Sequence, residues 1–186
     1  VDDGSYDEIT NIISAGVVMA LRKETIERVG LFDPKIPYFF LDVDLSWRIW
    51  LSGYRVVFVP KSKVFHLAKP VVPHRRRAIE YDSQKNCIRM LMKNYDARNL
   101  VKYFPIAVGA MFLRALIQPK ASSRYATVGL IKGLIWNLRF LKDTLQERRV
   151  IQGRIRTVSD EFVLNQISAE LSPLYIYFRY LARGYY

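Results

Sequence analysis

The chain has 186 residues, of which 51% are hydrophobic, and it carries a formal net charge of +12. This length and composition allow one domain with a substantial buried core, or one domain with an appendage. The single cysteine, Cys87, excludes an internal disulfide and is typical of a reducing compartment. The acidic N-terminal stretch, which has no basic start followed by an apolar run, predicts no signal peptide.

The segment 42–66 predicts a helix, a tight turn and two short strands. Its first apolar residues recur with the spacing of one helical face, at Val43, Trp47, Trp50 and Leu51. Gly53 follows at the position favoured just past a helix C-terminus. The run 54–59 is rich in β-branched and aromatic residues and predicts a strand, and the apolar run 64–65 predicts another. The two tryptophans are expected to pack in the core, although an aromatic side chain at the edge of a pocket could instead stack on a sugar ring.

Two carboxylates open this predicted helix, where the helix macrodipole favours negative charge. Asp44 lies four residues before Arg48 and is expected to pair with it along the helix. Asp42 is open to two interpretations: an N-cap, since aspartate is favoured there, or an acid/base group. The residue pattern by itself leaves both open.

Several ordered motifs in this region resemble family 2 glycosyltransferases, most closely the rhamnosyltransferase-like members. They are Gly30-Leu31-Phe32-Asp33, the Asp-Val-Asp-Leu-Ser-Trp-Arg run from Asp42, Gly53-Tyr54-Arg55-Val56, Pro60 and His66. The segment 14–22 is similar to the family's strand before its acceptor pocket, and the segments 92–95 and 148–152 are similar to its C-terminal tail. The resemblance implies an α/β fold, the C-terminal, acceptor-side part of a GT-A-like nucleotide-diphospho-sugar transferase, followed by an α-helical tail.

The resemblance also implies a role for each matched residue. Asp42 matches the catalytic base, which takes the proton from an acceptor hydroxyl as that oxygen attacks the anomeric carbon and inverts it. His66 matches a histidine that in some members completes the site of a divalent cation, Mg or Mn, holding the diphosphate. The residues expected to bind the acceptor are Gly16, Asp44, Trp47 and Arg48. Those expected to bind the diphosphate are Arg75, Arg76 and Arg77.

Other interpretations of these residues stay open. His66, beside Phe65, could be an ordinary partly buried histidine, and the arginines at 75–77 could form a solvated loop. Leu41 stands where the family usually has glutamate before the base. The chain starts about where the family's donor-binding half should end, so we expect it to be inactive alone. The expected boundaries are 1–77 for the acceptor-side part and 78–186 for a basic helical tail.

The tail is predicted to be helical, with a first helix over 78–94 and a new helix start at Ser159. The apolar segment 100–118 carries two cations and a proline, and its apolar core is shorter than the ~20 residues needed to span a bilayer. The segment 125–149 predicts an amphipathic helix. Its apolar face is formed by Val128, Ile131, Ile135, Leu138, Leu141 and Leu145, and its polar face by Lys132, Arg139, Lys142, Gln146 and Arg149.

A basic face, an apolar face and the nearby Trp136 suit an anionic membrane surface, although the same helix could pack on protein with its cations in water. Lipid-linked acceptors, common in the family, favour the membrane. The expected partners are a nucleotide-sugar donor, a glycan or lipid-linked acceptor and the cytoplasmic face of a membrane. The alternative is a non-catalytic basic module that binds a membrane, a partner subunit or nucleic acid. Nucleic acid is not expected, because no recognition motif is visible.

Overall fold

The computed structural model describes residues 8–14, 16, 18–65, 67, 75–117 and 120–167, the side chains of 120–122 excepted. Within these ranges helices dominate. The elements are β1 Thr10–Asn11, α1 Lys23–Val29, α2 Leu41–Leu51, β2 Val57–Phe58, α3 Arg76–Asn94, α4 Ala97–Ile117, α5 Lys120–Arg139, α6 Leu141–Val150, the π-helical turn η2 Ile151–Ile155, and α7 Asp160–Gln166.

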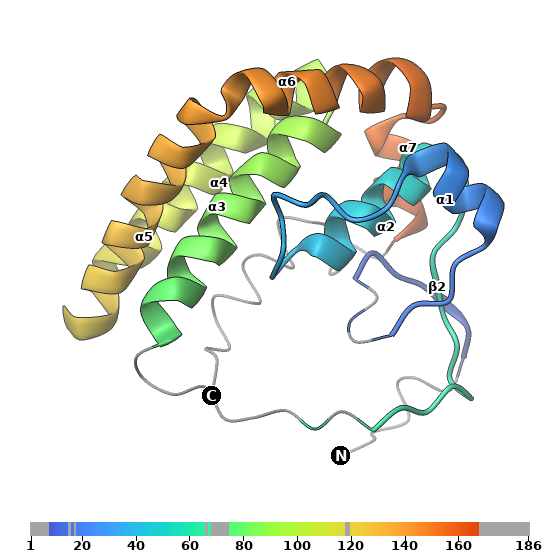
Figure 1. Ribbon diagram of the computed structural model, residues 1–186, viewed down its shortest axis with the longest axis horizontal. Coiled ribbons are helices and arrows are strands. Elements are labelled where there is room, and N and C mark those ends of the chain that lie inside the picture. Colours follow the sequence, from blue (N-terminus) through green and yellow to red (C-terminus); the bar gives the residue numbers. More distant parts are fainter. Residues whose placement is uncertain are drawn as a thin grey trace.

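The helices α3, α4 and α5 lie side by side as a bundle (Figure 1). From the end of α5, α6 continues across α3 towards the smaller region that holds α1, α2 and α7. In the described part of the chain the only sheet is antiparallel and has two residues per strand, with Thr10 opposite Phe58 and Asn11 opposite Val57.

The expected α/β fold is therefore wrong. An α/β transferase fold needs a mostly parallel sheet covered by helices, whereas this structure is mainly a helical bundle. Of the run 54–59 only β2 is a strand, and neither the pair 64–65 nor the described residues of 14–22 are in one. The physical reason is that β-propensity acts only where a partner strand is available, and here β1 offers two residues.

The predicted helix α2 is confirmed, and it ends where the sequence indicates, with Gly53 at φ +85°. It is buried on most sides because α1, α3 and α7 all contact it. Trp47 and Trp50 are 2% and 1% exposed, and the Trp50 indole donates to the carbonyl of Ile12 at 2.8 Å. The predicted helix at 78–94 is confirmed as α3. Ser159 caps α7, and its hydroxyl accepts from the Phe162 amide at 3.1 Å.

The predicted helix at 125–149 is interrupted at Phe140, whose backbone leaves the helical region at φ −100° and ψ 18°. The Phe140 ring packs on Trp136 with centroids 4.6 Å apart. This break divides the segment into α5 and α6 and lets α6 turn across α3. The continuous helical pattern of 125–149 therefore does not predict this break.

The contact between α3 and α5 is close because α5 turns small residues towards α3. A Cβ at Gly129 would lie 3.0 Å from the carbonyl carbon of Glu80, and one at Gly133 would lie 3.2 Å from the amide nitrogen of Lys85. The Asn137 amide donates to the carbonyl of Lys85 at 3.0 Å. The predicted apolar face of α5 therefore stays outside, with Ile131, Ile135 and Leu138 exposed by 52%, 59% and 70%.

Candidate functional site

Helix α2 begins at a backbone corner with an unusual conformation. Phe39 and Phe40 both have positive φ, 43° and 65°, which is rare for bulky residues and costs energy. The Asn86 side chain on α3 donates to the carbonyls of Tyr38 and Phe39, the second at 3.3 Å. Helix α3 thus supports the turn from which α2 starts.

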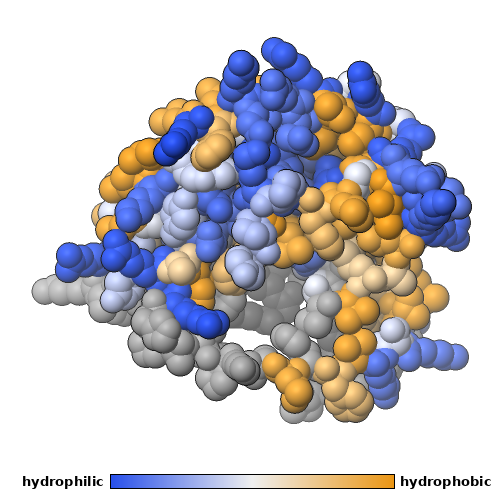
Figure 2. Space-filling model, viewed as in Figure 1, coloured by the Kyte–Doolittle hydropathy of each residue, from blue (hydrophilic) through white to orange (hydrophobic). Residues whose placement is uncertain are grey.

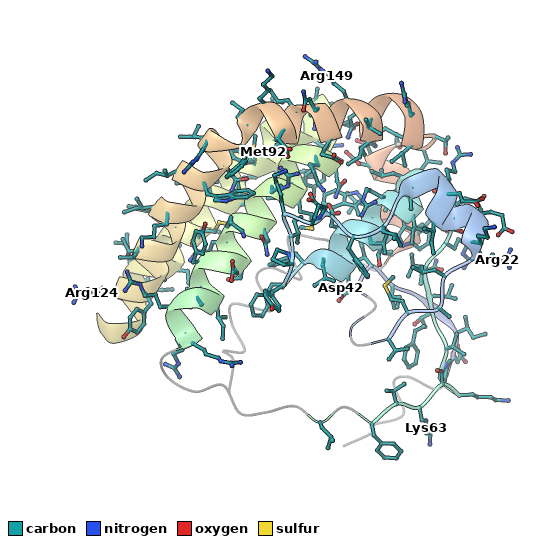
Figure 3. All side chains as sticks on the ribbon, viewed as in Figure 1. Arg22, Asp42, Lys63, Met92, Arg124 and Arg149 are labelled. Carbon is teal, nitrogen blue, oxygen red and sulfur yellow. The ribbon has the colours of Figure 1, made fainter. Side chains whose placement is uncertain are left out.

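Asp42 lies in the first turn of α2, outside the three-helix bundle (Figure 3). The N-cap position belongs to Phe40, so Asp42 does not cap the helix. Instead its Oδ2 accepts hydrogen bonds from the Ser14 hydroxyl at 2.6 Å and from the Gly16 amide at 3.1 Å. We call Ser14, Gly16, Phe39, Phe40, Asp42 and Asn86 the Asp42 corner.

The carboxylate of Asp42 is partly exposed. Within the described part of the chain, both hydrogen bonds that it accepts reach Oδ2. That geometry fixes one oxygen and leaves Oδ1 able to accept from an incoming hydroxyl. A carboxylate held in this way meets the geometric requirement for a general base, which must lie at hydrogen-bond distance from the proton it removes.

The residues expected to bind the acceptor divide into two groups. Gly16 lies on Asp42, as just described. Asp44, Trp47 and Arg48 are only 1%, 2% and 5% exposed, and they lie in the interior. Arg48 pairs with Asp44 at 3.1 Å, as the spacing predicted, and Trp47 packs edge-on against Tyr95 at 4.5 Å.

A buried charge network, which the sequence analysis did not anticipate, joins α2 to α3. Asp33 accepts from Arg89 at 2.8 Å and from Lys93 at 2.5 Å, and Lys93 also pairs with Asp44 at 3.2 Å. Burial raises the pKa of Asp33, but the charges of Lys93 and Arg89 and their hydrogen bonds outweigh it, so this pKa lies well below its ordinary value. Arg89 extends the network to Asp143 on α6, at 2.8 Å.

One sequence signal could have indicated the network. Lys85, Arg89 and Lys93 recur every four residues and so share one face of α3. A solvated helix face shows the same pattern, and only the packing of α2 and α6 on α3 distinguishes the two cases. These ion pairs connect residues on both sides of the boundary expected at 77/78.

The second notable surface is a groove of about 580 Å³ between α3 and α5, which we call the α3–α5 groove. Its cations are Arg77, Lys132 and Arg139, and the rings of Tyr81 and Trp136 also line it. Arg77 is one of the three arginines expected to bind a diphosphate. Arg75 is the N-cap residue of α3, and Arg76 is the first residue of this helix.

The expected metal ligand His66 lies outside the described residues, and so does His74. Among the residues that the structure describes, no group of three or more His, Cys, Asp or Glu side chains is arranged to hold a metal ion. These residues therefore supply no ligand set for the divalent cation that the resemblance implies.

Helix α4 exposes a long apolar face. The segment 100–118 was expected to be too short to span a bilayer, but α4 runs without a break through Pro105, and among the described helices it is the one long and apolar enough, by length and composition, to cross a membrane. Only 17% of its apolar window is buried, so most of that window faces outwards. Its most exposed apolar side chains are Val101, Ile106, Phe112, Leu113, Leu116 and Ile117. Along the outer edge of α5, Figure 2 shows hydrophobic residues next to hydrophilic ones.

Comparison of the chain with protein-family models, curated proteins and solved structures found no match. Function is therefore inferred from features of the chain itself. These are the Asp42 corner, the α3–α5 groove and the apolar face of α4.

Proposed function

We propose that this chain supplies the acceptor side and the catalytic base, Asp42, of an inverting glycosyltransferase that works at a membrane surface. The observation that supports this most is the Asp42 corner. One carboxylate oxygen is held by Ser14 and Gly16, the other accepts no hydrogen bond from the residues that the structure describes, and the side chain is partly exposed. The reaction class comes from the motifs around Asp42 that resemble family 2 glycosyltransferases.

In the proposed step an acceptor hydroxyl binds against Oδ1 of Asp42. Its proton passes to Oδ1 while the hydroxyl oxygen forms a bond to the anomeric carbon of the donor sugar. The bond from that carbon to the nucleoside diphosphate breaks, and the diphosphate leaves with the electron pair. Because the hydroxyl attacks the face opposite the leaving group, the configuration of the carbon is inverted. The donor is a nucleotide sugar, rhamnose being the leading candidate, and the acceptor is a glycan or a lipid-linked glycan.

The surroundings of Asp42 serve positioning in this proposal. A strained backbone persists only where its neighbours hold it, and such strain concentrates at functional sites. Here the strained pair Phe39 and Phe40 is held by Asn86, from a different helix. Asn86 belongs to α3, a central helix of the bundle, and its side chain therefore gives the turn before the base a rigid support.

The test is turnover of the complete natural protein that contains this chain. Purified protein is incubated with UDP-, GDP- and dTDP-linked sugars and a membrane lipid extract, and release of nucleoside diphosphate is measured. Asp42→Asn keeps the shape and should lower kcat by about 10²–10⁴-fold, the usual contribution of a general base. Glu147→Gln removes the same charge from an exposed position on α6 and should leave kcat unchanged. Full turnover by Asp42→Asn would disprove the assigned role.

The exposed apolar face of α4 favours a second candidate, a non-catalytic module that binds a membrane surface. An apolar face of this kind, in a chain with net charge +12, suits the boundary between headgroups and acyl chains. Attachment through apolar side chains should persist at high salt, whereas nucleic-acid binding would weaken steeply. Co-sedimentation with vesicles in 0.1 M and 1 M salt measures how far membrane attachment depends on salt. The double variant Phe112→Ser with Leu116→Ser should release the protein from the vesicles.

A further inference from the structure

The α3–α5 groove collects positive charge from two helices. Arg77 comes from the first turn of α3, and Lys132 and Arg139 come from α5. Lys132 and Arg139 are seven residues apart, about two helical turns, so they lie on one face roughly 10 Å apart along the axis. All three side chains are exposed. The described lining of the groove contains no carboxylate, so its charge is complementary to an anion.

The wall of the groove between these cations is apolar. Val128, Gly129 and Ile135 line it, and Ile135 is 59% exposed. The same face of α5 continues outwards through Ile131 and Leu138. A soluble phosphate gains nothing from such a surface, whereas a lipid covers it while its phosphate meets the cations.

The aromatic residues do not favour a nucleotide base as the occupant. The ammonium of Lys85 lies over the Trp136 ring, 4.9 Å from its centroid, and Phe140 packs against the same ring. Lys85 also lies over the Tyr81 ring at 5.4 Å. The Tyr81 and Trp136 rings therefore already make contacts within the protein. What the groove offers a ligand is three cations beside an apolar wall.

We propose that the α3–α5 groove binds the phosphate of an anionic phospholipid. Arg77, Lys132 and Arg139 contact the headgroup, while Ile131, Ile135 and Leu138 lie at the level where the acyl chains begin. The inference rests on the membrane association proposed above and adds a headgroup site to it. It does not depend on the role of Asp42.

The experiment measures binding of the full chain to vesicles of phosphatidylcholine alone and of phosphatidylcholine mixed equally with phosphatidylglycerol. The double variant Lys132→Gln with Arg139→Gln removes two groove cations. Each cation near an anionic surface contributes about fivefold, so the loss of two should weaken binding to the anionic vesicles about 30-fold. Binding to phosphatidylcholine should not change. Lys132→Arg with Arg139→Lys keeps both charges and should bind like the unmodified chain.

The matched control is Arg22→Gln with Lys63→Gln, which removes the same charge from exposed positions far from α5 (Figure 3). It should leave binding to anionic vesicles unchanged. Equal weakening by both double variants would mean delocalised attraction and would overturn the site. Displacement from vesicles by inorganic phosphate at constant ionic strength would point to a soluble anion and would also overturn it.

Failure of the membrane proposal itself gives a different result. In that case the unmodified chain binds neither kind of vesicle. If only the headgroup site is wrong, the unmodified chain still binds vesicles, but the Lys132→Gln, Arg139→Gln variant weakens binding to anionic vesicles no more than the Arg22→Gln, Lys63→Gln control does.

Discussion

Replacing Asp33 by asparagine tests whether the buried charge network holds α2 against α3. Asp33 is 8% exposed and accepts from Arg89 and Lys93, whose side chains are each 1% exposed. Asparagine has nearly the same shape but leaves these two cations without their shared counter-charge. Removing one partner of a buried ion pair typically costs about 3–5 kcal/mol, a large share of the ~5–15 kcal/mol that stabilises a domain.

The balance of charge in the network supports a value in this range. Three carboxylates, Asp33, Asp44 and Asp143, face the buried cations Arg48, Arg89 and Lys93, and a fourth cation, the partly exposed Lys35, pairs with Asp143 at 2.7 Å. Asp143 is about a third exposed, at 35%, so water can screen it. Asp33 is therefore one of only two fully enclosed negative charges in the network, and its loss leaves an excess positive charge in the interior.

The assay is urea unfolding of the chain followed by tryptophan fluorescence at pH 7 and at pH 3. The pKa of Asp33 is lower in the folded state than the unfolded value of ~3.9. Its ionised form therefore adds stability at pH 7, and this contribution is lost as the pH falls below about 4 towards the folded pKa. The difference between the unmodified chain and Asp33→Asn should be largest at pH 7 and smaller at pH 3.

Two controls define the test. Glu27→Gln disrupts the surface ion pair with Lys23, in which the Glu27 side chain is 63% exposed and the Lys23 side chain 85%. This change should alter the free energy of unfolding by less than about 0.5 kcal/mol. Adding Lys93→Met to Asp33→Asn removes the excess charge and should cost less than the sum of the two single changes. A loss below about 1 kcal/mol for Asp33→Asn at pH 7, or one that does not shrink at pH 3, would refute the reasoning.

Two further predictions concern packing. Gly129→Ala should destabilise the chain by about 1–3 kcal/mol, because the new Cβ meets the Glu80 backbone at 3.0 Å. Gly109→Ala, with nothing within 4 Å of its Cβ, should stabilise α4 by up to about 1 kcal/mol; thermal unfolding compares the two, and equal effects would contradict the close contact. Cys87 is buried and its pKa is raised by that burial, so its thiol should react with a disulfide reagent only after unfolding. Reaction in the folded chain as fast as in urea would show that this part of the core opens.

The local features of α2 could be predicted because they depend on neighbours close in sequence. The apolar spacing, the glycine after the C-terminus and the Asp44–Arg48 pair all occur within one helix, and the structure confirms each. The same holds for the Ser159 cap of α7. The motif also singled out Asp42. Its contacts with Ser14 and Gly16 were not predictable, since 28 and 26 residues separate them from it.

The α/β prediction failed because it treated short β-rich runs as strands without knowing whether they would find partners. The apolar face predicted for 125–149 was found, but most of it stays exposed while α5 packs through Gly129 and Gly133. Small residues give little hydrophobic signal, so the sequence pattern pointed to the wrong side of this helix. The break at Phe140 was equally hidden, because the apolar spacing of 125–149 continues through it.

The amino-acid sequence by itself determined where most helices lie, which tryptophans are buried and where the basic and apolar residues are concentrated. Those properties follow from periodicity, capping and composition, all of which act over a few residues. The tertiary structure alone decided that Lys85, Arg89 and Lys93 face the interior, and that Asn86 supports the turn before Asp42. It also decided that three cations from α3 and α5 share one groove. The physical reason is that a charged helix face is stable either in water or against opposite charges, and only the packing of distant segments selects between them.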